Sequence, residues 1–142
     1  MSKFMDIEYK EKLNESILSW LDDKFEKYAN KNNLLCNYKT FNFIAKQENK
    51  IIGILTGYSV YNEEIYIDLL FVIEEYRKRG IGSKLIKQVE DYYRNKNFNY
   101  MSLVTCGFQA PKFYEKCGFI LEFKRENKEN PKLTRYYFVK YF

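Results

Sequence analysis

The residues with the clearest chemical potential lie at a turn that carries two glycines, Gly80 and Gly82, directly before a predicted helix. Backbone N–H groups in the first turn of a helix have no intrahelical partner, and with the helix dipole they attract an anion. Glycine lets the backbone bend tightly and approach a ligand closely. The cations around the turn are Arg77, Lys78, Arg79, Lys84 and Lys87. The pattern indicates a diphosphate site, with a plain turn and solvated cations as the alternative.

Several other chemistries are excluded by what the chain lacks. Leu85 stands where a dinucleotide fingerprint needs its third glycine, and no phosphate loop of the G-x-x-x-x-G-K-[ST] type occurs. The chain has no histidine, which removes Ser-His and Cys-His nucleophile pairs and HExxH zinc sites. Its three cysteines fall in no metal or redox spacing. We therefore expect reduced core cysteines, no metal, and chemistry carried by carboxylate, tyrosine, lysine, serine or cysteine.

Composition predicts one globular domain over residues 1–142, with 46% hydrophobic and 30% charged residues. Lys and Arg exceed Asp and Glu by 24 to 19, and this charge of +5 suits an anionic small ligand or a weak nucleic-acid surface. No apolar run is long enough to span a membrane, and the first residues lack the apolar core of a signal peptide. We expect a cytoplasmic protein with no membrane partner.

Hydrophobic periodicity predicts a mixed α/β fold around a central sheet, because strands occur before, between and after helices. The stretch Ile65–Val72 is almost continuously apolar, which is typical of a strand buried on both faces. The expected strands are Phe4–Lys10, Phe41–Gln47, Lys50–Tyr61, Ile65–Val72, Tyr100–Cys106, Phe119–Lys124 and Thr134–Tyr141. The expected helices run from Asn14 to the polar stretch 30–33, from Ile81 to about Asn97, and over Ala110–Phe119 with Gly118 as C-cap.

Two motifs in this order resemble a known family. The R-x-x-G-x-G of Arg77–Gly82 follows a strand that ends in LLFV, and AxxxYEKxGF covers Ala110–Phe119. Together they resemble the coenzyme A signature of the GNAT N-acetyltransferase superfamily, and FQAP before FYEKxGF is similar to a subgroup of small bacterial acetyltransferases. The likeness covers about Phe4 to Tyr141 and implies a central mixed, mostly antiparallel sheet of six to seven strands flanked by helices.

The resemblance implies that acetyl-CoA is the cosubstrate and assigns its binding residues. Main-chain groups of Leu70, Phe71 and Val72 would pair with the pantetheine arm where a bulge splays the strand from its neighbour. Many relatives place Asn seven residues before the motif tyrosine, where this chain has Gly107, and the amide of Gln109 could make a similar contact. The pyrophosphate would be held at Arg77, Lys78, Arg79, Gly80, Ile81, Gly82 and Ser83.

The implied reaction is direct attack of a neutral amine on the thioester carbonyl. The amide of Val72 or a neighbour would stabilise the oxyanion, and Tyr114 would protonate the leaving thiolate. Asp68 is the candidate base, since a carboxylate inside an apolar strand needs a specific reason. The alternative is that Asp68 is structural and holds a hydrogen bond. Glu63 and Glu64 at the strand entrance are further candidates.

The predicted function is N-acetyl transfer from acetyl-CoA to a primary amine of a small molecule. The alternatives are a related module that binds acyl-CoA without turnover and serves as a sensor or partner, and a basic, tyrosine-rich nucleic-acid binder. Interspersed acids argue against the latter, so we expect no nucleic-acid partner. The aromatic tail from Arg135 could pair across a homodimer edge. The expected acceptor lining is Trp20, Tyr38, Tyr58, Tyr61 and Tyr66 with the loop 125–133.

Overall fold

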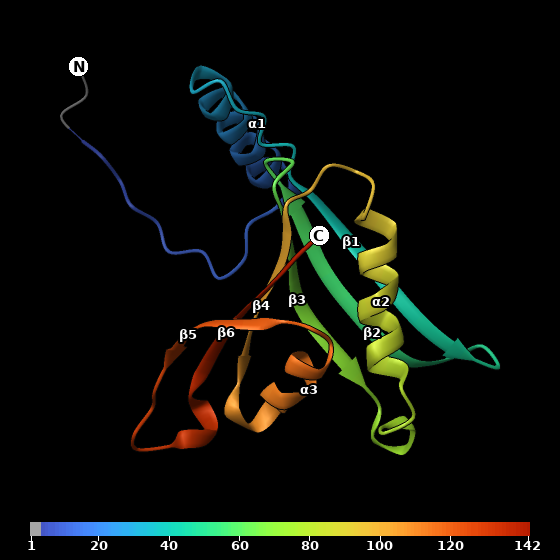
Figure 1. Cartoon of the computed structure of the whole chain (residues 1–142). Helices are drawn as coiled ribbons and strands as arrows, with labels where there is room; N and C mark the ends of the chain where they lie inside the picture. Colours follow the sequence, from blue (N-terminus) through green and yellow to red (C-terminus); the bar gives the residue numbers. More distant parts are fainter. Residues whose placement is uncertain (1–3) are drawn as a thin grey trace. The chain divides into compact units, whose positions relative to one another are not determined.

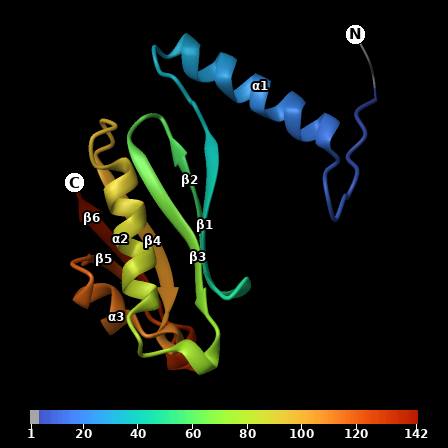
Figure 2. The ribbon, with the colours of Figure 1, turned by 90° about the vertical axis from the view of Figure 1, so that its right-hand side faces the viewer.

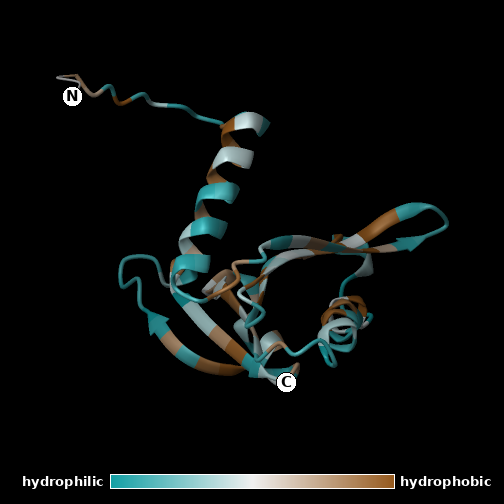
Figure 3. Ribbon diagram, turned by 90° about the horizontal axis from the view of Figure 1, so that it is seen from above, coloured by the Kyte–Doolittle hydropathy of each residue, from teal (hydrophilic) through white to brown (hydrophobic). Residues whose placement is uncertain are grey.

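The computed structural model describes residues 4–142 as two compact units, which are treated separately. In the first unit, residues 4–36, a single helix α1 spans Glu15–Lys31. Asn14 is its N-cap, and the side-chain Oδ1 of Asn14 accepts the Ile17 N–H at 2.9 Å. Figure 3 shows apolar and polar segments alternating along α1.

The predicted strand Phe4–Lys10 is wrong, because these residues form no strand. All seven are exposed, so the weak alternation of their side chains does not distinguish a buried face from a solvated one. A strand is stabilised by pairing with a neighbour and by burying one face, and this segment does neither.

The second unit, Asn37–Phe142, is built on one six-stranded sheet (Figure 1). The strand order is β1-β2-β3-β4-β6-β5, and every neighbouring pair is antiparallel except β3 and β4. The predicted mixed, mostly antiparallel sheet is confirmed. The strands are β1 Lys39–Gln47, β2 Lys50–Val60, β3 Glu64–Val72, β4 Tyr100–Cys106, β5 Ile120–Arg125 and β6 Arg135–Tyr141.

Two helices cover one face of the sheet, as Figure 2 shows for α2 (Ile81–Tyr93). The other helix is α3, Pro111–Lys116. The helix α2 ends before the predicted Asn97, whose φ of 66° is left-handed and cannot continue a helix. The prediction that Gly118 ends α3 in a left-handed conformation is confirmed: Cys117 is the C-cap, and Gly118 directly after it has a φ of 94°. No helix in residues 4–142 is long and apolar enough to cross a membrane.

The core of this unit lies between the sheet and the two helices. Leu55, Ile65, Val89, Met101 and Phe138 are essentially inaccessible and hold the layers together. The cysteines follow the prediction only in part: Cys36 is buried, whereas Cys106 and Cys117 are half-buried, and all three are free thiols.

The strand β3 differs along its length, and the prediction that it is buried on both faces is wrong. Ile65 and Ile67 are buried, whereas Asp68, Leu69 and Phe71 are exposed. These exposed residues lie beyond the part of β3 that pairs with β4. The apolar run Ile65–Val72 predicted burial along the whole strand, but fully buried residues occur only in the part that pairs with β4.

Candidate active site

The sheet opens between β3 and β4, and this gap is the centre of the candidate site (Figure 1). The parallel ladder runs from Glu64↔Tyr100 to Ile67↔Leu103 and goes no further. Directly after it, β3 carries a bulge: consecutive residues of β2 pair with Ile67 and Leu69, so Asp68 is the extra residue. Beyond Asp68, the edge of β3 that faces β4 has no strand partner among the described residues. The predicted splay at a bulge is confirmed.

Strand geometry fixes which main-chain groups face this gap. The N–H of Ile73 donates to Ile52 C=O at 3.0 Å, and N–H and C=O groups alternate sides along a strand. Phe71, opposite Ile54, therefore also bonds to β2. Leu70 and Val72 direct their groups into the gap. Of the three predicted pantetheine contacts, the main chain of Phe71 is thus already engaged with β2, and the Val72 C=O accepts a hydrogen bond from Arg77, so the main-chain groups of Leu70 and the Val72 N–H remain available.

The anion site lies at the start of α2. Gly80 is the N-cap with a φ of 80°, and the first hydrogen bond of the helix runs from Lys84 N–H to Gly80 C=O at 3.0 Å. The amides of Ile81, Gly82 and Ser83 therefore precede the ladder and are open to an anion. No acidic residue stands in this first turn, and Arg77, Lys78 and Arg79 are exposed beside it. The structure brings the predicted pyrophosphate residues together at one turn.

Arg77 connects this turn with the gap. Its Nε donates to the Val72 C=O at 2.8 Å, and its guanidinium lies 5.3 Å from the centre of the exposed Phe71 ring. The terminal nitrogens of the guanidinium form no hydrogen bond within the described residues. Arg77 thus fixes the end of β3 and keeps donors for an anion, a double role that the sequence motif did not reveal.

Gly82 has a packing role that the sequence analysis missed. A Cβ on Gly82 would lie 3.0 Å from Cζ of Phe113, whereas a Cβ on Gly80 would meet nothing within 4 Å. Ser83 forms a side-chain hydrogen bond with Cys117, one residue past the end of α3. The first turn of α2 and α3 therefore pack directly against each other. Gly82 allows this close approach.

Tyr114 lies on α3 within an aromatic cluster of Phe113, Phe119 and Phe138, with ring centres 5.1 to 6.0 Å away. The residue is 9% exposed, and burial raises the pKa of its hydroxyl to about 12. The hydroxyl has no hydrogen-bond partner in the described part of the chain. In that part, every fully buried polar side-chain atom has a partner. The Tyr114 oxygen is therefore not fully buried and retains contact with solvent. Such a tyrosine is protonated at neutral pH and can donate a proton.

A charged network holds α3 in place. Lys140 Nζ donates to Cys117 C=O at 2.8 Å, just past α3, and to Glu90 Oε1 of α2 at 2.7 Å. Burial raises the pKa of Glu90, but hydrogen bonds and charge from Lys140 and Arg94 outweigh it and lower that pKa below its ordinary value. Glu90 and Lys140 are fifty residues apart in sequence, so no local pattern could have found this pair.

Two predicted residues stand in unexpected surroundings. Asp68 is exposed and forms no hydrogen bond or ion pair in the described residues, so the expectation of a buried, held carboxylate is wrong. Its place two residues after Tyr66 puts it on the face of β3 opposite Ile65 and Ile67, away from the core. Gln109 accepts the Cys106 N–H through Oε1 at 2.9 Å, which closes the turn after β4 and leaves its amide nitrogen available. Glu63 accepts a hydrogen bond from Asn99, and Glu64 accepts one from Ser102.

Comparison with known proteins identifies the family of the chain. The sequence pattern of the Acetyltransferase (GNAT) family matches residues 4–119. Camello of Xenopus tropicalis, described as an N-acetyltransferase, is 30% identical over 81 residues, which cover 54% of this chain and 37% of camello. The chain spans about two fifths of the length of the camello proteins it matches.

Solved structures agree with the fold. A Bacillus cereus acetyltransferase superposes with a TM-score of 0.75 at 24% identity, covering 95% of this chain and 98% of that protein. A Bacillus anthracis protein in complex with acetyl coenzyme A, described as a streptothricin acetyltransferase, has a TM-score of 0.64 at 28% identity, covering 72% of this chain and 62% of that one. With the family pattern over more than half of its length, the chain belongs to the GNAT acetyltransferase family.

Proposed function

We propose that this protein transfers the acetyl group of acetyl-CoA directly to a primary amine of a small molecule. The observation that carries the proposal is the splayed edge of β3. There, the main-chain groups of Leu70 and Val72 face an open gap that leads to the free amides at the start of α2. An extended pantetheine arm fits such an edge as an added strand, and a pyrophosphate fits the helix terminus.

The proposed reaction gives a role to each reacting group. The amine nitrogen attacks the thioester carbon, and the developing oxyanion accepts a hydrogen bond from the Val72 N–H, which faces the gap. Asp68, exposed where the ladder ends, takes the proton that the amine must lose, directly or through water. The carbon–sulfur bond then breaks, and Tyr114 gives the leaving thiolate its proton. The products are an N-acetyl amine and free coenzyme A.

Relatives support acetyl-CoA as the acetyl donor. The Bacillus anthracis protein described above holds acetyl coenzyme A, and a GNAT acetyltransferase of Elizabethkingia anophelis has acetyl-CoA bound, with a TM-score of 0.63 to this chain. An aminoglycoside 6'-N-acetyltransferase with coenzyme A bound has a TM-score of 0.62. These proteins are named for different amine acceptors or for none, so the acceptor of this chain must be argued from its own residues.

The test is calorimetric titration of acetyl-CoA into the protein and a matched pair of variants, Gly80→Asp and Gly80→Asn. Both side chains tolerate the left-handed backbone of Gly80 and would enter open space, so both variants should fold. Only aspartate places a negative charge beside the pyrophosphate. We expect wild-type dissociation constants on the order of 1–100 μM, a small change for asparagine and at least about a tenfold weakening for aspartate.

Thiol release in the presence of a panel of amines then tests turnover. Binding of acetyl-CoA without release from any amine would indicate a module that binds acyl-CoA without catalysis. Absence of binding to the folded wild-type protein would refute the coenzyme site.

A further inference from the structure

Within the second unit, the face of the sheet opposite α2 carries a cavity that the proposed mechanism does not use. Its volume is about 370 Å³. The lining includes Glu64 and Tyr66 of β3, Tyr100 and Val104 of β4, and Glu122 of β5. Val104 is the first residue of β4 beyond the paired ladder, so the cavity extends along the sheet to the beginning of the gap. A ligand in the cavity could therefore reach the reacting thioester.

The cavity is aromatic and negatively charged. Two carboxylates and the rings of four tyrosines line it, and no lysine or arginine is among its lining residues in the described chain. This sign is opposite to the overall charge of +5. Carboxylates and tyrosine faces together attract an organic ammonium ion through charge and through cation–π contact.

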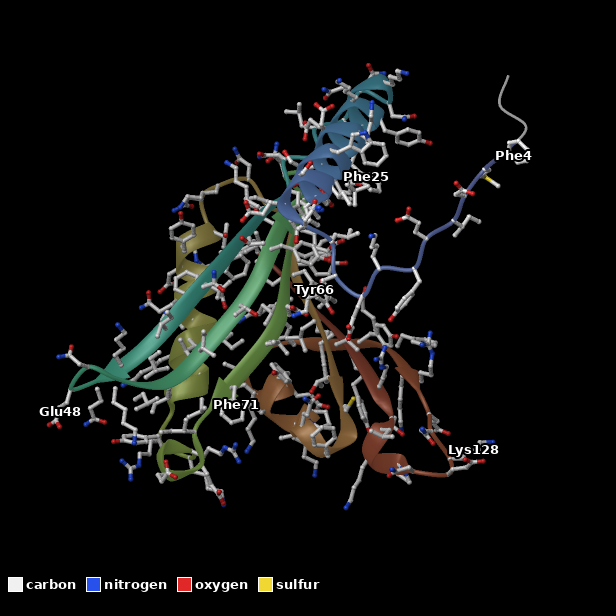
Figure 4. All side chains as sticks on the ribbon, turned by 180° about the vertical axis from the view of Figure 1, so that it is seen from behind. Phe4, Phe25, Glu48, Tyr66, Phe71 and Lys128 are labelled. Atoms are coloured by element: carbon white, nitrogen blue, oxygen red, sulfur yellow. The ribbon has the colours of Figure 1, made fainter. Side chains whose placement is uncertain are left out.

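Glu64 has the position of an ammonium acceptor. One of its oxygens, Oε2, accepts the Ser102 hydroxyl at 2.5 Å, which fixes the carboxylate and leaves the other oxygen available. Burial of the rings and, in addition, the negative charge of Glu64 raise the pKa values of Tyr58, Tyr66 and Tyr100, and two of these residues, Tyr66 and Tyr100, line the cavity with Glu64. The rings of Tyr58 and Tyr66 lie 5.1 Å apart, and Tyr66 is labelled on this face in Figure 4.

A further carboxylate, Asp68, lies outside the cavity lining, toward the other end of the same face of β3. Asp68 and Glu64 both act on Tyr58 and Tyr66, and four residues of strand separate their Cα atoms by about 13 Å. Asp68 adjoins the gap, where an amine must be neutral to attack. Arg135, which pairs with Cys106 at the gap end of β4, adds a positive charge there and disfavours a second ammonium.

We propose that the acceptor is a linear diamine or polyamine whose distal ammonium binds Glu64 in the tyrosine cavity while its near amine is acetylated beside Asp68. This inference rests on the proposed function and names its substrate class. In an extended chain, three consecutive bonds span about 3.3–3.6 Å. The two nitrogens of 1,8-diaminooctane are separated by nine bonds and therefore by about 10–11 Å. That length matches the distance between the Cα atoms of Glu64 and Asp68 once the two carboxylate side chains lean toward each other along the strand.

The experiment compares kcat/KM for thiol release from acetyl-CoA with three acceptors: diaminooctane with terminal amines, octylamine, and diaminobutane with terminal amines. Octylamine has a chain of the same length but no distal ammonium. Diaminobutane has the distal ammonium, but its two nitrogens are only five bonds, or about 6 Å, apart, so it cannot contact Glu64 while its other amine reacts. We expect diaminooctane to exceed each of the other two about tenfold, the usual scale for one charge-assisted contact.

The variant Glu64→Gln identifies the residue, with Glu63→Gln as its matched control. Glutamine keeps an acceptor for the Ser102 hydroxyl but removes the charge. The ratio of kcat/KM between diaminooctane and octylamine should fall to near one in Glu64→Gln. The ratio should stay at its wild-type value in Glu63→Gln. This variant also loses one negative charge, but at the neighbouring residue, whose side chain contacts Asn99.

The outcomes separate the inference from the function on which it rests. Equal efficiency with octylamine and diaminooctane, or a preference for octylamine, would refute the diamine inference and leave the acetyltransferase function intact. An unchanged ratio in Glu64→Gln would also refute it. No thiol release from any amine would refute the proposed function, and the inference with it.

Discussion

Replacement of Gly82 by alanine tests how the coenzyme turn is built. The added Cβ would lie 3.0 Å from the Phe113 ring, closer than the 3.4–4 Å of ordinary contact. Overpacking of this kind costs about 1–3 kcal/mol. Alanine is favoured over glycine in a helix by up to about 1 kcal/mol. We therefore expect Gly82→Ala to lower the free energy of unfolding by up to about 2 kcal/mol and to displace α3, which carries Tyr114.

A second substitution turns this into a coupling measurement. Phe113→Leu removes the ring that the new methyl group meets, at a cost of its own of about 1–2 kcal/mol. If the clash is the cause, the double variant should be more stable than the sum of the single effects by at least about 1 kcal/mol. Gly80→Ala is the control: it is strained by its φ of 80° but touches nothing, so Phe113→Leu should not rescue it.

The assays are urea denaturation for stability and calorimetric titration for acetyl-CoA affinity. We expect the double variant Gly82→Ala/Phe113→Leu to recover coenzyme affinity to within about threefold of Phe113→Leu alone. Additive stability effects would refute the packing argument. Recovery of stability without recovery of affinity would mean that the methyl group meets the coenzyme, as the sequence motif alone suggested.

Three further perturbations follow from the site. Tyr114→Phe should fold normally but reduce turnover on the order of 10²-fold, measured by thiol release, because the leaving thiolate loses its acid; wild-type turnover would contradict this. Burial raises the Tyr114 pKa from 10.0 to about 12, so the folded state favours the neutral hydroxyl and loses that stability as the pH rises from 10 to 12. Between these pH values, Tyr114→Phe should therefore lose about 2 kcal/mol less stability than wild type in urea titrations, and parallel curves would refute the raised pKa of Tyr114. Lys140→Met should cost about 1–3 kcal/mol and reduce turnover, because it frees α3 and removes a partner of Glu90. Lys87→Met, which breaks only the exposed pair with Asp91, should cost less than about 0.5 kcal/mol, and equal effects of the two would contradict the role of Lys140.

Local patterns predicted the elements of the site well. The strand before Arg77, the glycines at the turn and the apolar spacing of α2 are all determined by residues close in sequence, and the structure brings them together as expected. The left-handed Gly118 that follows α3 was predictable for the same reason, since a left-handed residue after a short helix favours glycine.

Contacts between distant segments could not be predicted from those patterns. Gly82 meets Phe113 and Lys140 meets Glu90 only because the sheet brings α2, α3 and β6 together. The engagement of the Phe71 main chain likewise depends on its register with β2, which a single apolar run does not reveal. The strand predicted at Phe4–Lys10 failed for the related reason that alternation alone does not provide a partner.

The bulge at Asp68 explains why one residue of β3 affects so much of the site. Before it, Ile65 and Ile67 face the core and the strand pairs with β4. The extra residue interrupts the alternation after Asp68, so that Leu69 is exposed and Leu70 lies on the core side, packed against the buried cluster. It also coincides with the end of the ladder, beyond which the groups of Leu70 and Val72 have no strand to bond. The bulge therefore determines which side chains of β3 pack on the core, and it lies where the edge of β3 becomes free to bind a ligand.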